Sequence, residues 1–106
     1  MNKKKVILFG AGDFGKNALK KINKTKYKVL GFVDNDKSKS GELVKGFTVY
    51  HVSELQSLDF DLIFITSQFF PEIRNQLNEL KIYNYKIIKK SKNVFSKIQS
   101  FIARQR

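Results

Sequence analysis

The sequence lacks the residues that most often build metal and redox sites. It has no cysteine and only one histidine, His51. Without cysteine the chain can form neither a disulfide framework nor a thiolate metal site, and it has no cysteine nucleophile. A single histidine cannot form a metal cluster by itself. We therefore expect no metal site.

Long hydrophobic runs are also missing. The apolar run Val6–Phe9 follows three lysines and stops at Gly10. It is too short for a signal-peptide core or a membrane span, so we expect a cytoplasmic protein. Hydrophobic residues still make up 42% of the 106 residues, which is enough for the core of one domain.

Acidic residues are scarce, and the net charge is +12. Residues 1–50 hold twelve lysines against four acids, and residues 81–106 hold eight basic residues and no acid. Between them, residues 51–80 hold one arginine against five acids. A basic balance favours anionic partners such as phosphates, nucleic acid or acidic lipid headgroups. Alternatively, the lysines only keep a small domain soluble.

Short apolar runs alternate with helical periodicity along the chain. The predicted strands are residues 6–9, 27–33, 47–50, 61–66 and 85–88. The predicted helices are residues 14–22, 53–58, 71–80 and 94–102. Residues 37–46 are polar and predict a loop. This alternation predicts an α/β fold, a doubly wound parallel sheet of about five strands with helices on both faces.

The stretch GAGDFG, residues 10–15, has the spacing G-x-G-x-x-G between a predicted strand and a predicted helix. In this context the spacing is typical of a phosphate-binding loop. Gly10 would allow the tight turn, Gly12 would let the backbone approach a pyrophosphate, and Gly15 would let the helix pack on the strand. The unpaired N–H groups at the helix start would face the phosphates. A purely structural turn is the alternative.

Asp34 ends the second predicted strand, 24 positions after Gly10. An acidic residue at this place typically hydrogen-bonds the ribose hydroxyls of a dinucleotide. The next residue is Asn35 rather than arginine or lysine, which favours NAD or a plain nucleoside diphosphate over NADP. An Asx-turn within Asp34-Asn35-Asp36 is the structural alternative.

Three stretches together carry a resemblance to a known family: KKVILFGAGDFGKNALKKI, YKVLGFVDNDKSKSGELVKGFTVYHVSEL and FDLIFITSQ. Over roughly residues 4–90 the chain resembles the small Rossmann-type nucleotide-binding domain of bacterial polysaccharide-biosynthesis proteins. Such a domain forms the amino-terminal part of nucleotide-sugar dehydratases and epimerases. It also precedes the acyltransferase body of some sugar acyltransferases.

The resemblance implies a cofactor site for NAD or a nucleotide sugar. The residues that would line the phosphates are Gly10, Gly12, Asp13, Phe14 and Gly15. Asp34 would bind a ribose, and Thr66 and Ser67, which follow the fourth predicted strand, would border the cofactor.

Candidate catalytic residues are few. Catalytic members of the family carry a Tyr-x-x-x-Lys pair or an equivalent proton-transfer set in a further domain. Tyr85 and Lys89 have this spacing, but in a strand they would lie on one face, about 13 Å apart. His51 is expected to be a surface residue, and Asp59 and Asp61 a solvated loop edge. We predict a nucleotide-binding module without catalytic residues of its own.

Two aromatic residues, Phe69 and Phe70, follow the fourth predicted strand at the edge where ligands bind in this architecture. They could stack on a base or sugar, or simply cover the core.

The chain is expected to have two parts, a Rossmann-like domain over residues 1–90 and a basic amphipathic carboxy-terminal helix over residues 91–106. The helix could pack on the domain, bind a partner protein or a further domain, or lie on an anionic membrane. A homodimer is a further candidate assembly.

Two other functions remain open, a dinucleotide-sensing regulatory domain and a basic nucleic-acid-binding protein. The acidic middle third argues against nucleic acid as a partner, because it interrupts a continuous basic face.

Overall fold

The structure is a computed structural model and describes residues 2–89. Its strands are β1 (Lys4–Phe9), β2 (Tyr27–Asp34), β3 (Leu43–Val44), β4 (Phe47–His51), β5 (Leu62–Ile65) and β6 (Tyr85–Ile87). Its helices are α1 (Asp13–Lys21), α2 (Phe70–Glu79) and the two 3-10 helices η1 (Lys37–Lys39) and η2 (Val52–Ser57).

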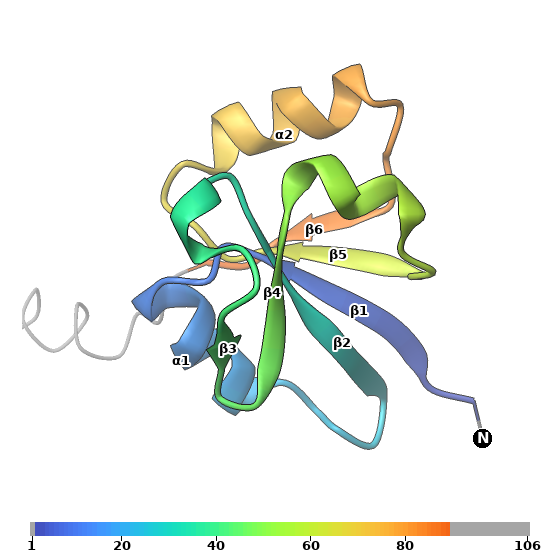
Figure 1. The fold of residues 1–106 in the computed structure, drawn as a ribbon. Coiled ribbons are helices and arrows are strands. Elements are labelled where there is room, and N and C mark those ends of the chain that lie inside the picture. Colours follow the sequence, from blue (N-terminus) through green and yellow to red (C-terminus); the bar gives the residue numbers. More distant parts are fainter. Residues whose placement is uncertain (1, 90–106) are drawn as a thin grey trace, which may run out of the picture.

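The six strands form one sheet in the order β3-β4-β2-β1-β5-β6 (Figure 1). The pairs from β4 to β6 are all parallel, and only the short edge strand β3 is antiparallel to its neighbour. The chain winds from β1 to one edge of the sheet and then crosses back to build the other half from β5. In sheets of this kind, ligands bind outside the carboxyl ends of the strands at the point where the winding reverses, here between β1 and β5.

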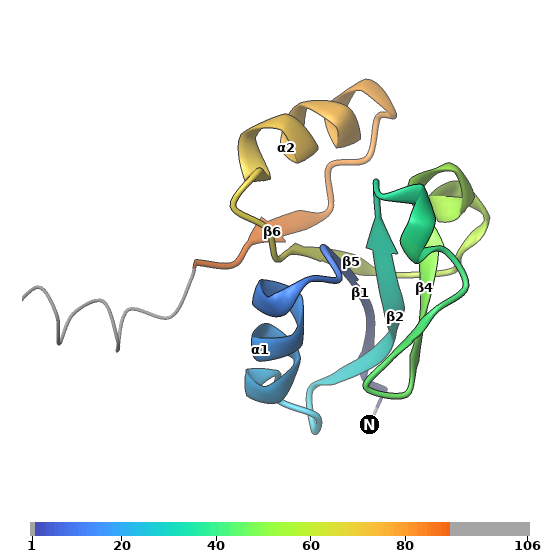
Figure 2. The ribbon, with the colours of Figure 1, turned by 60° about the vertical axis from the view of Figure 1, so that its left-hand side comes forward.

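Helices cover both faces of the sheet (Figures 1 and 2). Val6 and Leu8 of β1 belong to the core cluster under α1, whereas Ile7 and Phe9 belong to the cluster under α2 and η2. All four are almost fully buried, as expected for a continuous apolar strand covered on both sides. The predicted doubly wound sheet with helices on both faces is confirmed.

The prediction of a plain loop over residues 37–46 is wrong. This segment contains η1 and also β3, which forms a hairpin with β4 through Lys45 and Gly46. Both turn residues have positive φ, 53° and 85°, as the tight turns of two-residue hairpins require. Lysine is an uncommon residue at the first of these positions, so the turn was not recognised.

The predicted carboxy-terminal helix over residues 91–106 lies outside the described residues. Within residues 2–89, no helix has the length and apolar character needed to cross a membrane.

Candidate functional site

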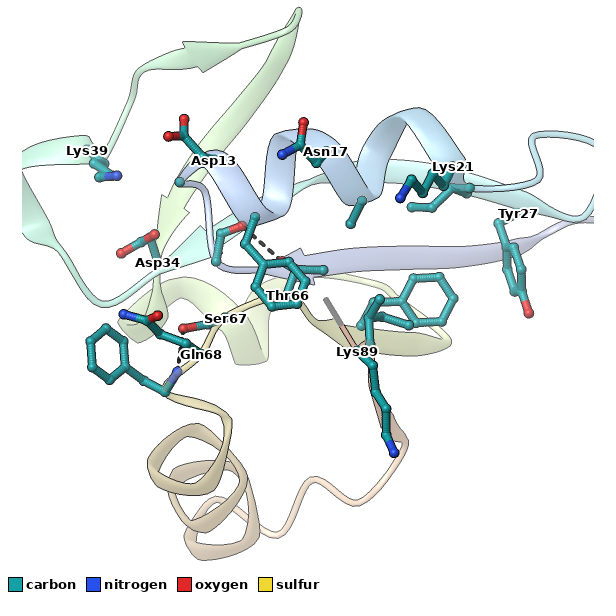
Figure 3. Close-up of a pocket in the computed structure, with 18 of the residues that line it drawn as sticks. Asp13, Asn17, Lys21, Tyr27, Asp34, Lys39, Thr66, Ser67, Gln68 and Lys89 are labelled. Carbon is teal, nitrogen blue, oxygen red and sulfur yellow. Dashed lines mark hydrogen bonds between the residues drawn. The ribbon is translucent and has the colours of Figure 1, made fainter. Parts of the chain in front are cut away.

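A groove of about 900 Å³ runs along α1, from the glycine loop at the carboxyl edge of the sheet to the start of β2 (Figure 3). Asp13, Asn17 and Lys21 lie one turn apart along its helical wall. Seven of the eight residues predicted to bind the cofactor line this groove: Gly10, Gly12, Asp13, Phe14, Asp34, Thr66 and Ser67. Gly15 is buried beneath the loop. The fold therefore brings the predicted set together at one place.

Two of the three glycines are required by packing alone. Gly10 has a φ of +126°, and a Cβ on it would lie 2.4 Å from the Thr66 carbonyl oxygen. A Cβ on Gly15 would lie 1.9 Å from the carbonyl oxygen of Gly10. Contacts this short cannot be accommodated without moving the backbone. These two glycines would be needed with or without a ligand.

Gly12 differs from the other two. It is the N-cap of α1, with an ordinary φ of −86°. A Cβ on it would meet only the Nζ of Lys39, at 4.0 Å, which is normal van der Waals contact. No side chain within residues 2–89 caps α1. Packing thus gives no reason for glycine here, and the helix N-terminus opens into the groove.

Asp34 connects the glycine loop to the turn after β2. Its Oδ2 accepts a hydrogen bond from the backbone N–H of Ala11 at 2.8 Å. Its Oδ1 accepts a hydrogen bond from the backbone N–H of Asp36, also at 2.8 Å. The second bond is the Asx-turn foreseen as the structural alternative. A carboxylate has about four acceptor positions, so each oxygen keeps one for a ligand hydroxyl.

The side chain of Asn35 is bound to α2. Its amide exchanges two hydrogen bonds with that of Gln76, at 3.0 and 2.9 Å. The residue after Asp34 therefore braces the end of β2 against a helix.

Thr66 and Ser67 use their hydroxyl groups to shape the backbone. Thr66 is 1% exposed, and its hydroxyl donates to the carbonyl oxygens of Gly10 and Phe9, at 3.0 and 3.2 Å. The hydroxyl of Ser67 accepts from the N–H of Phe69 at 3.0 Å. Thr66 thus holds the glycine loop from below, while Ser67 orders the turn that leads into α2.

Phe69 lines the same groove and is 60% exposed, whereas Phe70 begins α2. An aromatic side chain this exposed at a groove wall is consistent with the stacking prediction, which stays a prediction.

Lys39 lines the groove and was not among the residues predicted from the sequence. It comes from η1 and is half-buried, whereas Lys37 in the same turn is exposed. The sequence feature that could have indicated Lys39 is its place just after the acidic residues Asp34 and Asp36. It was obscured by the many other lysines, and only the packing of η1 next to the glycine loop distinguishes this one.

Two other candidate residues, His51 and Tyr85, do not line the groove. His51 caps η2, since its Nδ1 accepts from the N–H of Ser53 at 3.2 Å. The prediction that Tyr85 and Lys89 share a face is wrong. Tyr85 packs on the α2 side and its hydroxyl donates to Asn78 at 2.8 Å, while Lys89, past the end of β6, lines the groove on the α1 side.

Comparisons with known proteins agree on the fold. The family described as C2185-like, N-terminal, matches residues 2–88. No curated protein matches the chain. Among solved structures, the chain is similar to UDP-D-quinovosamine 4-dehydrogenase from Vibrio fischeri, with a TM-score of 0.68 and 23% identity over 90% of this chain and 85% of that one.

The chain is also similar to RSP, a Rex-family repressor, with a TM-score of 0.68 and 12% identity over 98% of this chain and 61% of that one. A further similar structure is RSP in complex with β-NAD+ and operator DNA, with a TM-score of 0.65 and 13% identity over 97% of this chain and 57% of that one. This chain therefore spans less than two thirds of the repressor. At such identities the likenesses show the fold alone.

Proposed function

The chain belongs to the C2185-like, N-terminal family, and from the geometry of its groove we propose that it binds NAD or a nucleotide sugar. Both ligands contain a nucleoside diphosphate. The pyrophosphate would lie against the glycine loop and the start of α1, where backbone N–H groups and the helix dipole favour an anion. The ribose hydroxyls would donate to Asp34.

Gly12 is the observation that carries the proposal. Gly10 and Gly15 are explained by steric contacts within the domain, but the structure provides no such contact for Gly12. A side chain there would project toward the groove between α1 and Lys39. Glycine is acceptable as the N-cap of a helix, and close approach of a phosphate to the backbone would explain why no larger capping side chain stands here.

The similar structures support this choice of ligand. One is an enzyme whose name specifies a UDP-sugar, and another holds β-NAD+. Asn35 adds to the case for NAD over NADP, because its side chain is held by Gln76 and brings no positive charge to a 2′-phosphate.

The proposed role is that of a ligand-holding module in a bacterial polysaccharide-biosynthesis protein, with the chemistry supplied by another domain or chain. The support is the resemblance of residues 4–90 and the similarity to an enzyme that acts on a nucleotide sugar. The groove wall itself is lined mainly by lysines, aspartates and apolar side chains.

Thermal unfolding with candidate ligands tests the proposal. NAD+, NADH, UDP and a UDP-sugar are each added to the wild-type chain, with NADP+ and adenosine for comparison. A ligand at one hundred times its Kd stabilises the folded state by about 2.7 kcal/mol and raises the unfolding midpoint. The proposal is overturned if no compound with a pyrophosphate raises it.

The Gly12→Ala variant shows where the ligand binds. We expect this variant to keep its stability to within about 1 kcal/mol, since the new Cβ meets nothing closer than 4.0 Å. Ligand stabilisation should be lost, because the methyl group occupies the space needed by the phosphates. Full ligand binding by a folded Gly12→Ala variant would place the ligand elsewhere.

A dinucleotide-sensing regulatory domain is the second candidate, favoured by the similarity to a repressor that has been solved with both β-NAD+ and operator DNA. The same unfolding series with a short DNA duplex addresses it. For a sensing domain, NAD+ and NADH should have different effects on the oligomeric state or on the affinity for DNA. For a module that holds a nucleotide sugar, neither NAD+ nor NADH should change the oligomeric state or the affinity for DNA.

A further inference from the structure

Lys39 is a half-buried residue that lines the groove, and its ammonium has no direct partner in the part of the chain that the structure describes. Within residues 2–89 its ammonium forms neither an ion pair nor a hydrogen bond with another side chain. The remaining residues from 90 to 106 contain no aspartate or glutamate, so they can supply no acidic side chain to it.

The position of Lys39 is defined by a short chain of hydrogen bonds. Asp36 caps η1, with its Oδ1 accepting from the N–H and hydroxyl of Ser38 at 3.0 and 2.7 Å. The N–H of Asp36 donates to Asp34, which also accepts from Ala11 in the glycine loop. The loop, the end of β2 and η1 are thus connected. Lys39 Nζ lies 4.0 Å from the position of a Cβ on Gly12, and Figure 3 shows Lys39 at the same end of the groove as Asp13 and Asp34.

The charged residues around the glycine loop are mostly acidic. Asp13, Asp34 and Asp36 line this end of the groove. Lys16 does not line the groove, and its Nζ lies 4.0 Å from a carboxylate oxygen of Asp13. The pKa of the Asp36 carboxyl is lowered, mainly by the hydrogen bonds from Ser38 and to a smaller degree by the positive charge of Lys39. A pyrophosphate entering here would meet carboxylates on both sides, and Lys39 is the cation placed to offset them.

Among the lysines that line the groove, Lys39 is the one whose Nζ lies next to the position of a Cβ on Gly12. Lys21 lies with Tyr27 toward the far end of α1 (Figure 3), and Lys26 directly precedes Tyr27 in the chain. Lys21 is eight residues beyond Asp13, which is about 12 Å along the helix axis. That rise separates the backbone of Lys21 from the start of α1, where the phosphates would bind.

We propose that Lys39 Nζ binds the pyrophosphate of a nucleoside diphosphate ligand held against Gly12 and the start of α1. The inference rests on the proposed function and adds a residue to it. The connection between β2 and β4, which contains no long helix, would then form the outer wall of the phosphate site. The chemistry recognised is the diphosphate, whether it comes from a dinucleotide or from a nucleotide sugar.

Isothermal titration of Lys39→Ala and Lys37→Ala with ADP, UDP, NAD+, NADP+, a UDP-sugar and adenosine tests the inference. Lys37 is the matched control, because it lies in the same turn, carries the same charge and does not line the groove. We expect Lys39→Ala to weaken binding of the diphosphates by about ten- to hundred-fold. Lys37→Ala should change it less than about twofold, and adenosine should bind both variants as it binds the wild type.

The outcomes separate the two proposals. If the wild type binds diphosphates and Lys39→Ala binds them equally well, the Lys39 inference fails while the proposed function stands. If the two lysine variants lose equal affinity, the effect is one of net charge, and the inference also fails. Loss confined to NADP+ would assign Lys39 to a 2′-phosphate and overturn it. If the wild type binds none of the diphosphates, both proposals fail. An unchanged unfolding midpoint of Lys39→Ala confirms that the variant is folded.

Discussion

At the carboxyl edge and at the amino edge of the sheet, an aspartate accepts a hydrogen bond from a backbone N–H, but the lysines near the two edges differ in whether they have a partner. At the carboxyl edge, Asp34 accepts the backbone N–H of Ala11 just after β1, at 2.8 Å. At the amino edge, Asp61 accepts the backbone N–H of Lys5 within β1, at 2.7 Å. In each case an aspartate next to β1 satisfies a backbone donor.

The lysines at the two edges differ. At the amino edge, the ammonium of Lys5 lies 2.6 Å from a carboxylate oxygen of Asp59. At the carboxyl edge, Lys39 has no such partner within residues 2–89, and the neighbouring Gly12 leaves space beside it. The comparison teaches that charged residues alone do not mark a site. We propose a site at the carboxyl edge because a lysine without a direct partner within residues 2–89 lies next to a glycine that packing does not require.

The largest effect is expected from Gly15→Ala. The new Cβ would lie 1.9 Å from the Gly10 carbonyl oxygen and 3.2 Å from Phe32 Cε1, so α1 would have to move away from the sheet. We expect a loss of about 3 kcal/mol in the free energy of unfolding, measured by urea denaturation. Gly12→Ala, in the same loop, is the control and should lose about 1 kcal/mol or less. Equal stabilities of the two variants would contradict the division of the loop into structural and ligand-binding glycines.

Asp34→Asn should have the next largest effect, and it should act on binding. The amide loses the charge and can no longer accept hydrogen bonds from the donors at both of its ends. We expect at least about tenfold weaker binding of NAD+ or a UDP-sugar in isothermal titration, with about 1 kcal/mol lower stability.

Asp61→Asn is the matched control for Asp34→Asn, because it disturbs an equivalent bond to the backbone at the opposite edge. It should lower stability by a similar amount, about 1 kcal/mol, and leave ligand affinity unchanged. If both variants lost affinity equally, the effect of Asp34 would be on the fold as a whole rather than on the ligand.

The smallest effect is expected from Asp59→Asn. Asp59 raises the pKa of Lys5 above the ordinary 10.5, mainly by accepting a hydrogen bond from its ammonium. A raised lysine pKa stabilises the folded state below the unfolded value, and this is lost as the pH rises through the folded value. Asp59→Asn should therefore be slightly less stable than wild type near pH 7, the two should converge above the folded pKa of Lys5, and NMR titration should show that pKa moving back toward 10.5. A difference that persisted at high pH would assign the effect to something other than this pair.

Much of the fold could be predicted because it depends on local patterns. The apolar run of β1 predicted a strand covered on both faces, and Pro71 marked the start of α2, where proline needs no N–H partner. The hairpin of β3 was missed because its turn uses Lys45 in a conformation more typical of asparagine. The carboxyl-edge location of Asp34 could be predicted, but its bond to Ala11 joins two segments far apart in sequence and could not.

By itself, the sequence determined the alternation of strands and helices and the glycine spacing, because periodicity and turn chemistry act over a few neighbouring residues. The tertiary structure decided which glycines are explained by packing and which lysine lies beside the loop. Both depend on distances between segments that meet only after folding: Gly10 against Thr66, Gly15 against Gly10, and Lys39 beside Gly12. Packing explains two of the three glycines of GAGDFG, and the space beside the third, Gly12, is where we propose that the ligand binds.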